Sequence, residues 1–279
     1  MQVLHEKSFI KKQQDPLRGE NMSEPSAISA FCIACLASLL VVAFAPPAAG
    51  QNDWDRFGIE LETGPVWQGR NDVQIPGDTG TRYSFKDLTS SGPYPAGRLT
   101  FDWNPRQRHG FRFIVSLLEF DDRGTFDQPV LFNGTPFAPG VSTRGTYKFN
   151  TYRAGYRYLF FSTDSWRMQA GVTILVRDAK IELEQDGVRA SDSDFGFVPL
   201  LTFSANWAFA PRWTAMFDFE GLAGGPGRAL DLALKVRYDL SGQWHVGVGY
   251  RTLEGGVDSD DVYNFSWFHY ALLTMGYRF

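Results

Sequence analysis

The chain has 279 residues, of which 43% are hydrophobic and 15% aromatic, with 28 glycines and a formal net charge of −4. Without a basic tract, nucleic-acid binding has no electrostatic support, and a mean hydropathy of −0.24 excludes a bundle of membrane helices. Many aromatic residues and glycines are typical of a protein built from strands, where aromatic side chains are favoured and glycine relieves crowding.

Residues 1–50 predict an export signal. Their apolar run, Ala30 to Ala45, is about sixteen residues long, shorter than the ~20 that a spanning helix needs. The small residues Ala48-Ala49-Gly50 follow it, as a signal peptidase prefers. We expect cleavage near Gly50, which leaves residues 51–279 as a single domain. The basic residues before the run are Lys7, Lys11, Lys12 and Arg18.

Two details of this segment stay open. Met22 is an alternative start, but the basic residues would then be lost. Cys32 and Cys35, the two cysteines of the chain, have the CxxC spacing of a redox motif, but they lie inside the apolar run. A lipid anchor on Cys35 is a weaker alternative, because the run continues well past it. We therefore expect a mature chain without cysteine.

The mature chain is predicted to form ten strands, because apolar and polar residues alternate at period two in ten segments. Long loops are expected at 70–94 and 121–143, a polar loop at 185–193, and Gly-rich or acidic loops at 223–228 and 254–261. The connections between these are short. The predicted strands are 57–68, 96–103, 111–120, 145–161, 166–184, 194–209, 213–222, 229–240, 244–253 and 262–279.

The last predicted strand, VYNFSWFHYALLTMGYRF, has one apolar face that begins and ends with aromatic residues, and the chain stops there at Phe279. It resembles the closing strand of bacterial outer-membrane β-barrels, the small OmpA- and porin-like superfamily. An even strand count, with one short-turn end and one long-loop end, is typical of such barrels with both termini in the periplasm. We therefore expect an all-β fold: a single closed, antiparallel, up-and-down transmembrane barrel of about ten strands, with eight or twelve as alternatives.

The positions of the tryptophans favour a membrane barrel over a soluble one. A soluble core would have them in mid-strand, whereas a membrane barrel collects them at the strand ends, where they meet lipid headgroups. Five of the eight lie near predicted short turns, and Trp267 would lie at the other rim. The predicted interfacial aromatic girdle consists of Trp103, Trp166, Trp207, Trp213, Trp244, Trp267, Tyr277 and Phe279.

If the apolar faces meet lipid, the polar faces line the lumen. Ten basic and seven acidic residues then fall inside, and buried charges must pair or keep water. We expect a network of arginine–carboxylate pairs. The predicted lumen residues are Glu60, Glu62, Arg98, Asp102, Arg112, Arg153, Arg157, Arg167, Arg177, Asp218, Glu220, Asp231, Lys235, Arg237, Asp239, Arg251 and Arg278.

Candidate catalytic groups are few. His109 lies in a short turn, and His245 is expected to point inward within reach of Asp239. His269 is on the lipid-facing row, and Ser266, three residues away, falls on the opposite face of the strand, so a Ser/His dyad fails on geometry. Omptin-type proteases, also ten-stranded, use Asp and His at the outer rim, but this chain has no histidine in a predicted outer loop.

The predicted role is therefore that of an outer-membrane barrel with a charge-filled lumen that serves in structure or interaction, without catalysis. A narrow channel for small, possibly anionic, solutes is the alternative, and a barrel enzyme acting on lipid or peptide comes third. The acidic loop 254–261 lacks the order of a calcium loop, so we expect no metal and no cofactor. The expected partners are outer-membrane lipid and lipopolysaccharide, and the barrel-assembly machinery through the terminal strand. We expect a monomer that binds no nucleic acid.

Overall fold

The computed structural model describes residues 55–225 and 227–279. The predicted export signal and its cleavage site lie outside these residues. Within the described part, no helix is long and apolar enough to span a membrane.

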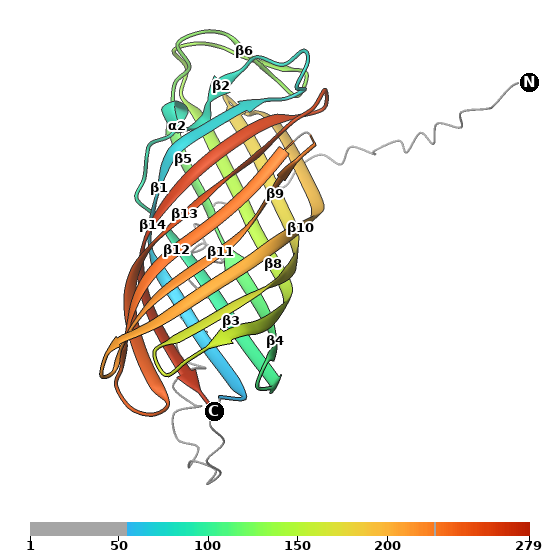
Figure 1. Cartoon of the computed structure of the whole chain (residues 1–279). Coiled ribbons are helices and arrows are strands. Elements are labelled where there is room, and N and C mark those ends of the chain that lie inside the picture. The colour runs from blue at the N-terminus through green and yellow to red at the C-terminus, as the bar shows by residue number, and fades with distance from the viewer. Residues whose placement is uncertain (1–54, 226) are drawn as a thin grey trace, which may run out of the picture. The chain divides into compact units, whose positions relative to one another are not determined.

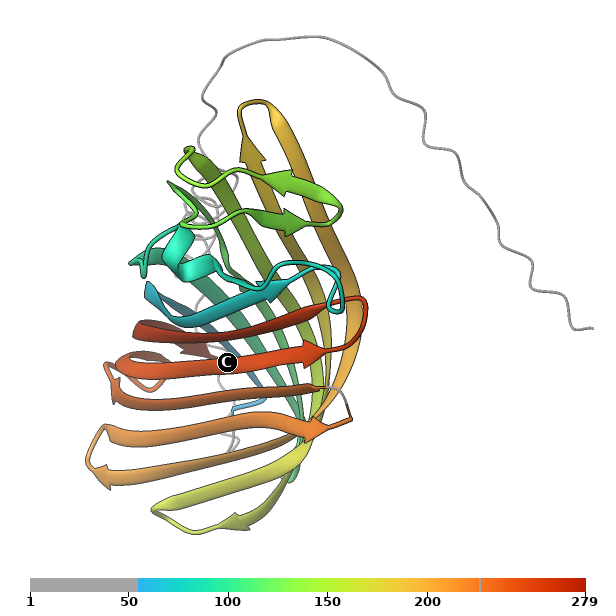
Figure 2. The same ribbon diagram turned by 90° about the horizontal axis from the view of Figure 1, so that it is seen from above.

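Ten strands form the wall of a closed barrel (Figures 1 and 2). Each pairs with its neighbours in antiparallel fashion, and β14 pairs with β1 to complete the ring. The predicted all-β, ten-stranded barrel is confirmed. The wall strands are β1 (Phe57–Gln74), β3 (Tyr94–Arg106), β4 (His109–Leu117), β8 (Thr143–Ser162), β9 (Trp166–Gln185), β10 (Val188–Ala210), β11 (Trp213–Gly224), β12 (Gly227–Asp239), β13 (Trp244–Asp258) and β14 (Tyr263–Arg278).

β14 pairs with β1, as predicted from the sequence of the terminal strand. The register between β14 and β1 runs from Gly58 opposite Arg278 to Gln74 opposite Tyr263, with one irregularity after Gln68. The Phe279 amide donates to the Phe57 carbonyl at 2.9 Å, and the two rings lie 5.6 Å apart. No strand edge is left open at this seam, which matters because unpaired backbone groups cost several kcal/mol each in hydrocarbon.

The side chains alternate between an apolar outside and a polar inside. On β12, Leu234 is 53% exposed and Val236 37%, whereas Lys235 between them is 6% exposed. A soluble barrel has the opposite arrangement, because its core must be apolar. The outward apolar row and the inward charges are what a lipid-facing wall requires.

The segments predicted as the two longest loops are partly folded and form a cap at the end of the barrel opposite Phe279 and the start of β1 (Figure 1). β1 continues to Gln74, and β5 pairs with β8 beyond the end of β4. These segments were expected to be loops because they are rich in Gly, Pro and polar residues, yet their aromatic residues come together. The cap elements are β2 (Tyr83–Ser84), α2 (Phe85–Leu88), β5 (Glu119–Gly124), β6 (Val130–Phe132) and β7 (Thr135–Phe137).

The cap and the adjoining barrel interior share one apolar core. Phe85, fully buried, packs against Phe120 and Tyr147 at ring distances of 6.3 and 5.7 Å. Two glycines leave room for α2 to pack against the wall. A Cβ at Gly145 would lie 2.9 Å from the Phe85 ring, and a Cβ at Gly124 would overlap the Leu88 carbonyl. The barrel is thus closed at this end by a hydrophobic core of the kind found in soluble domains.

The prediction of a polar loop at 185–193 is wrong. β9 and β10 run on through this segment and are joined by a tight turn at Asp186 and Gly187, both at positive φ, as a two-residue hairpin of this type requires. Residues 186–189 at the tip of the hairpin are exposed, whereas Leu183, Gln185 and Ala190 are buried, with Gln185 hydrogen-bonded to the backbone of Ala138 in the cap. Polarity at the tip indicated exposure and did not indicate a loop.

Candidate functional site

The middle of the lumen is filled by one connected cluster of charged side chains, which we call the ion-pair cluster. Seven strands contribute to it, and its six basic and six acidic members balance in charge. Because inward positions recur every second residue, neighbouring strands bring their charges to similar heights. The members are Glu60, Glu62, Arg98, Asp102, Arg112, Arg153, Arg157, Asp218, Glu220, Asp231, Lys235 and Arg251.

Asp231 is the most connected member on the side towards the cap. It is 3% exposed and lies 2.6 Å from an Arg98 nitrogen and 2.7 Å from an Arg153 nitrogen. Arg251 binds it as well, and also reaches Glu62 at 2.7 Å. Three arginines from three strands therefore share one carboxylate, which ties β3, β8 and β13 to β12 across the lumen.

Lys235 is the central member on the side of the cluster that faces the short-turn end of the barrel. Its ammonium lies 2.6 Å from Glu60 and 2.8 Å from Glu62, so β12 is tied to β1 past the two strands between them, β13 and β14. Arg112 binds Asp102 with two nitrogens, at 2.6 and 2.8 Å. Such bidentate, charge-assisted pairs are among the stronger hydrogen bonds in proteins and fix the geometry of both partners.

Five predicted lumen residues lie outside the cluster. Arg167, Arg237 and Arg278 line a cavity at the short-turn end, and Asp239 binds Arg278 at 3.0 Å. Arg177 lies at the opposite end of the lumen, where it pairs with Asp194. The structure thus brings twelve of the seventeen predicted residues together and places the other five above and below them.

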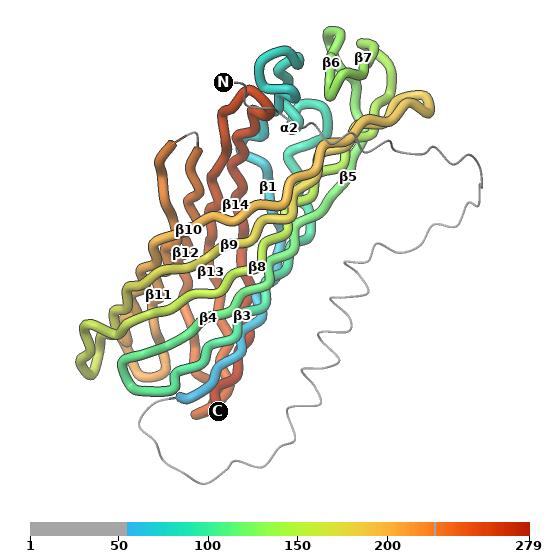
Figure 3. The backbone as a smooth tube through the Cα atoms, turned by 90° about the vertical axis from the view of Figure 1, so that its right-hand side faces the viewer, coloured from blue at the N-terminus to red at the C-terminus, as the bar shows by residue number. Residues whose placement is uncertain are grey.

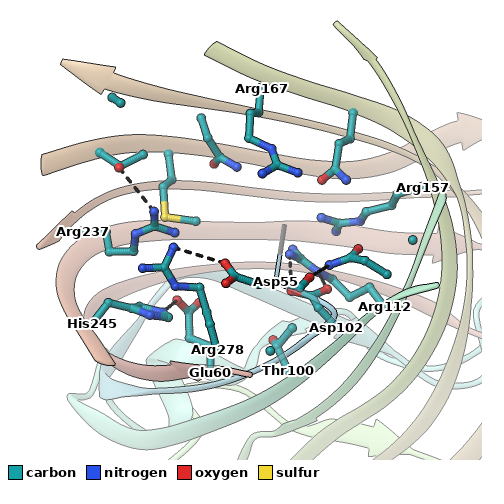
Figure 4. A pocket seen from close by; sticks show the side chains of 18 of the residues that line it. Asp55, Glu60, Thr100, Asp102, Arg112, Arg157, Arg167, Arg237, His245 and Arg278 are labelled. Atoms are coloured by element: carbon teal, nitrogen blue, oxygen red, sulfur yellow. Dashed lines mark hydrogen bonds and ion pairs between the residues drawn. The ribbon is translucent and has the colours of Figure 1, made fainter. Parts of the chain in front are cut away.

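The cavity at the short-turn end, which we call the vestibule, has a volume of about 250 Å³. Figure 4 shows Arg157, Arg167, Arg237 and Arg278 entering it from several sides. Arg167 forms no ion pair with any described residue, and the buried Nη1 of Arg157 makes no hydrogen bond among them, only a longer ion pair with Asp218 at 3.6 Å. The vestibule is therefore an open, positively charged chamber that ends at the ion-pair cluster.

Two predicted pairs of side chains, those of His245 and Arg278, are wrong, and Gly276 explains the first. His245 was expected to bind Asp239, but its Nε2 lies 3.4 Å from a Glu60 oxygen. Gly276 stands between the two strands at this height, and a Cβ there would lie 2.2 Å from the His245 ring nitrogen. Without a side chain at Gly276, His245 reaches across β14 to β1.

Arg278 was expected to bind Glu60 or Glu62, but its partners are Asp239 at 3.0 Å and Asp55 at 3.4 Å. The register sets Gly58 opposite Arg278, so the β1 glutamates lie higher in the lumen. Asp55 precedes the first predicted strand, and nothing in the alternation pattern pointed to it.

Most of the predicted girdle tryptophans stack on an aromatic residue of the neighbouring strand. Trp166 and Trp207 lie with parallel rings 5.6 Å apart, and Trp103 pairs with Phe111 at 5.3 Å. The other pairs at the short-turn end are Trp213 with Tyr238, Trp244 with Tyr277, and Tyr277 with Phe279. Trp267 lies on the outer face of the wall, 44% exposed, and contacts His269 at 4.8 Å.

The histidines and serines lie apart from one another. His269 Nδ1 lies 2.6 Å from the Tyr250 hydroxyl on the outer face. Ser266 faces inward, where its hydroxyl accepts a hydrogen bond from Tyr147 at 3.2 Å. His109 binds the Tyr156 hydroxyl at 2.8 Å near a short turn. Among the described residues, no group of three or more His, Cys, Asp or Glu side chains is arranged to hold a metal ion.

Comparison with known proteins shows similarity at the level of the fold. No protein-family model and no curated protein matches the sequence. The outer-membrane protease OmpT from Escherichia coli aligns with a TM-score of 0.53 and 7% identity, over 80% of this chain and 96% of that chain. Ail, the attachment invasion locus protein of Yersinia pestis, aligns with a TM-score of 0.38 and 13% identity, over 80% and 99%.

The toluene transporter TodX of P. putida aligns with a TM-score of 0.34 and 10% identity, over 85% of this chain and 92% of that chain. At these identities the protease and transport activities named for these proteins are not carried over to this chain. The closed ten-stranded wall, with its apolar outer surface and buried charges, gives this chain the fold of a transmembrane β-barrel, similar to that of the outer-membrane protease.

Proposed function

We propose that this protein is a closed, non-conducting barrel that serves in structure or interaction at the outer membrane. The observation that carries the proposal is the ion-pair cluster. A cavity of about 20 Å³ remains among its side chains, which is room for about one water molecule. A solute would have to break several buried ion pairs to pass.

The geometry of the wall supports the same function. Ten strands make a lumen near the size that side chains can fill, well below that of open porins. The apolar core under the cap adds a second seal at the other end of the lumen. With both seals in place, the parts of the molecule offered to a partner are the cap and the outer wall.

Single-channel recording of the refolded protein in planar bilayers tests this function. The wild type should give no discrete conductance steps. The double variant Arg153→Ala/Glu220→Ala removes both members of a pair that is 2.6 Å apart, and should give intermittent steps because it empties part of the cluster. Leu201→Ala, an outward change of similar size, is the matched control and should stay silent. Regular steps in the wild type would overturn the proposal.

A narrow anion channel is the second candidate, and the vestibule favours it. Arg167 has no counter-ion among the described residues, and a positive chamber attracts small anions. If the wild type conducts, a channel for anions should show a current that prefers chloride over potassium and falls in Arg167→Gln. Silent wild-type bilayers would exclude this candidate.

The orientation in the membrane is a separate proposal. We infer that the short-turn end, with both termini, faces the periplasm and that the cap faces outward, because long outer connections and short periplasmic turns are the rule for such barrels. Since the expected mature chain has no cysteine, single cysteines can report it. Thr125→Cys should react with an impermeant reagent on intact cells and Arg106→Cys should not. The reverse pattern would invert the orientation.

The proposed partners follow from the same placement. Lipid and lipopolysaccharide would contact the outer wall, and the assembly machinery would recognise the terminal strand through its aromatic end. Deleting Phe279 should impair membrane assembly and leave export intact, which fractionation of cells can measure. Normal insertion of the truncated chain would count against this role of Phe279.

A further inference from the structure

The wall of the barrel is incomplete at one place near the cap end. β10 pairs with β11 only from Leu201 onwards, opposite Gly221. Above that height, the described residues of β10, 188–200, pair with β9 alone, and β11 ends after Gly224. Figure 3 shows β9 and β10 rising away from β11 and β12. A proline at position 199 fits this free edge, because it has no amide hydrogen to donate to a missing partner.

An apolar cavity of about 350 Å³ lies behind this opening. Its walls come from β8, β9, β10, β12, β13 and β14, together with Ile75 and the β13–β14 loop, and include no residue of β11. Leu175, Val198 and Leu253 are among its apolar lining, and charged side chains, among them Arg177, Asp194 and Glu254, also line it. Pockets of this size that combine apolar walls with polar groups are typical of sites for small molecules and cofactors.

The surface on the lipid side of the opening is also apolar. Phe197 is 69% exposed, Leu201 57% and Leu222 42%, and all three lie beside the place where the strands part. The free backbone groups of β10 need water or headgroups, since they are costly in hydrocarbon. The opening therefore belongs at the boundary between membrane and water, where lipid headgroups lie and acyl chains begin.

We propose that this cavity binds the acyl chain of a membrane lipid, which enters sideways between β10 and the β11–β12 hairpin. Phe197, Leu201 and Leu222 outside the opening, and Leu175, Val198 and Leu253 inside it, offer the chain apolar contacts on both sides. The headgroup remains near the charged side chains of the lining. This binding function goes beyond the closed barrel proposed above and does not depend on whether the lumen conducts.

The alternation of the strands provides an internal control for a test. Leu175 points into the barrel and is 4% exposed, whereas its neighbour Ile174 points outward and is 49% exposed. The full protein is refolded into phosphatidylethanolamine/phosphatidylglycerol vesicles that contain a phosphatidylethanolamine with a diazirine in its acyl chain. After irradiation, mass spectrometry should find cross-links at inward residues, Leu175 and Leu253, as well as at outward ones. Cross-links at outward residues alone would overturn the proposal.

A variant that fills the cavity sharpens the result. Ala229 lines it, so Ala229→Phe should lower the ratio of Leu175 to Ile174 cross-links roughly tenfold, equivalent to about 1.4 kcal/mol of binding free energy. Leu230→Phe, one residue away on the outer face, is the matched control and should leave the ratio unchanged. Heat-modifiable migration in gels checks that each variant is folded, and Val198→Trp replaces Ala229→Phe if the latter is not. An unchanged ratio in the folded, filled variant would contradict acyl-chain binding.

Discussion

The two halves of this barrel interior are filled by different chemistry. Near the cap, Phe85, Phe120 and Tyr147 form part of an apolar core. Closer to the short-turn end, Asp231 and Lys235 belong to the ion-pair cluster. The outer wall is apolar around both halves. The membrane thus requires an apolar outer wall, whereas the interior can be filled by apolar packing or by ion pairs between buried charges.

The two fillings should respond differently to mutation. Loss of an apolar side chain leaves a cavity, and the cost depends on how far the surroundings collapse. Loss of one charge leaves its partners buried and unpaired. The cost in unfolding free energy is then higher than for an apolar truncation, because collapse of the surroundings does not neutralise the remaining charges. The ionic half should therefore be the more sensitive to single changes.

Asp231→Ala should have the largest effect. It leaves three buried arginines, Arg98, Arg153 and Arg251, without a shared carboxylate and should cost about 5 kcal/mol of the free energy of unfolding, the upper end of the range for a broken buried ion pair. Urea unfolding from lipid vesicles measures it. The control is Asp121→Ala, which breaks an exposed pair with Arg144 and should cost about 0–1 kcal/mol. Equal costs would mean that the cluster is hydrated.

Phe85→Ala tests the apolar half. The side chain is fully buried, so its truncation should cost about 3–5 kcal/mol. We expect the loss to fall on the cap, seen as faster hydrogen exchange in residues 83–88, with little change in the unfolding of the barrel wall. Leu131→Ala, at an exposed cap position, serves as the control. An equal fall in wall stability would show that the two halves fold as one unit.

Leu234→Arg probes the outside of the ionic half. Leu234 is 53% exposed on the lipid-facing row, and an arginine near the membrane midplane should cost roughly 2–4 kcal/mol. Leu234→Met keeps the apolar surface and should cost little. If the arginine variant were as stable as the methionine variant in vesicles, this row could not face hydrocarbon.

Tyr83→Phe should have the smallest effect, and it should be stabilising. The Tyr83 hydroxyl is buried in the cap without a hydrogen-bond partner among the described residues, and burial raises its pKa. Removing it should stabilise the cap by about 1 kcal/mol. Above about pH 10 the tyrosine ionises in the unfolded chain but not in the folded cap, so the wild type should lose further stability relative to the variant. A parallel pH dependence of the two proteins would contradict the burial of this hydroxyl.

The sequence predicted the wall well because alternation is a local signal. Leu234 and Lys235 could be assigned to opposite faces from their spacing alone, and all ten predicted strands occur in the wall. The strand ends were less accurate. The tip of the hairpin at Asp186 and Gly187 is exposed and carries no contrast between inside and outside.

The alternation of apolar and polar residues does not indicate which side chains pair across the barrel. The contact of His245 with Glu60 depends on the register of three strands and on the missing side chain of Gly276. The cap depends on isolated aromatic residues such as Tyr83 and Phe126, which lie in segments with no regular period and meet only in the folded chain. The clue in the sequence was that aromatic residues are unexpected in solvated loops.

In the proposed closed lumen, the ion-pair cluster separates the vestibule from the cap end, and the reactivity of single cysteines with a small charged thiol reagent tests this separation most directly. Gln169 and Thr173 lie on the same inward face of β9. Gln169 lines the vestibule, whereas Thr173 is 2% exposed and donates a hydrogen bond to Glu220 within the cluster. Gln169→Cys should react readily in the folded protein, and Thr173→Cys should react only after unfolding. Equal reaction rates at the two positions would show that water and solutes pass the cluster, and would contradict the closed lumen.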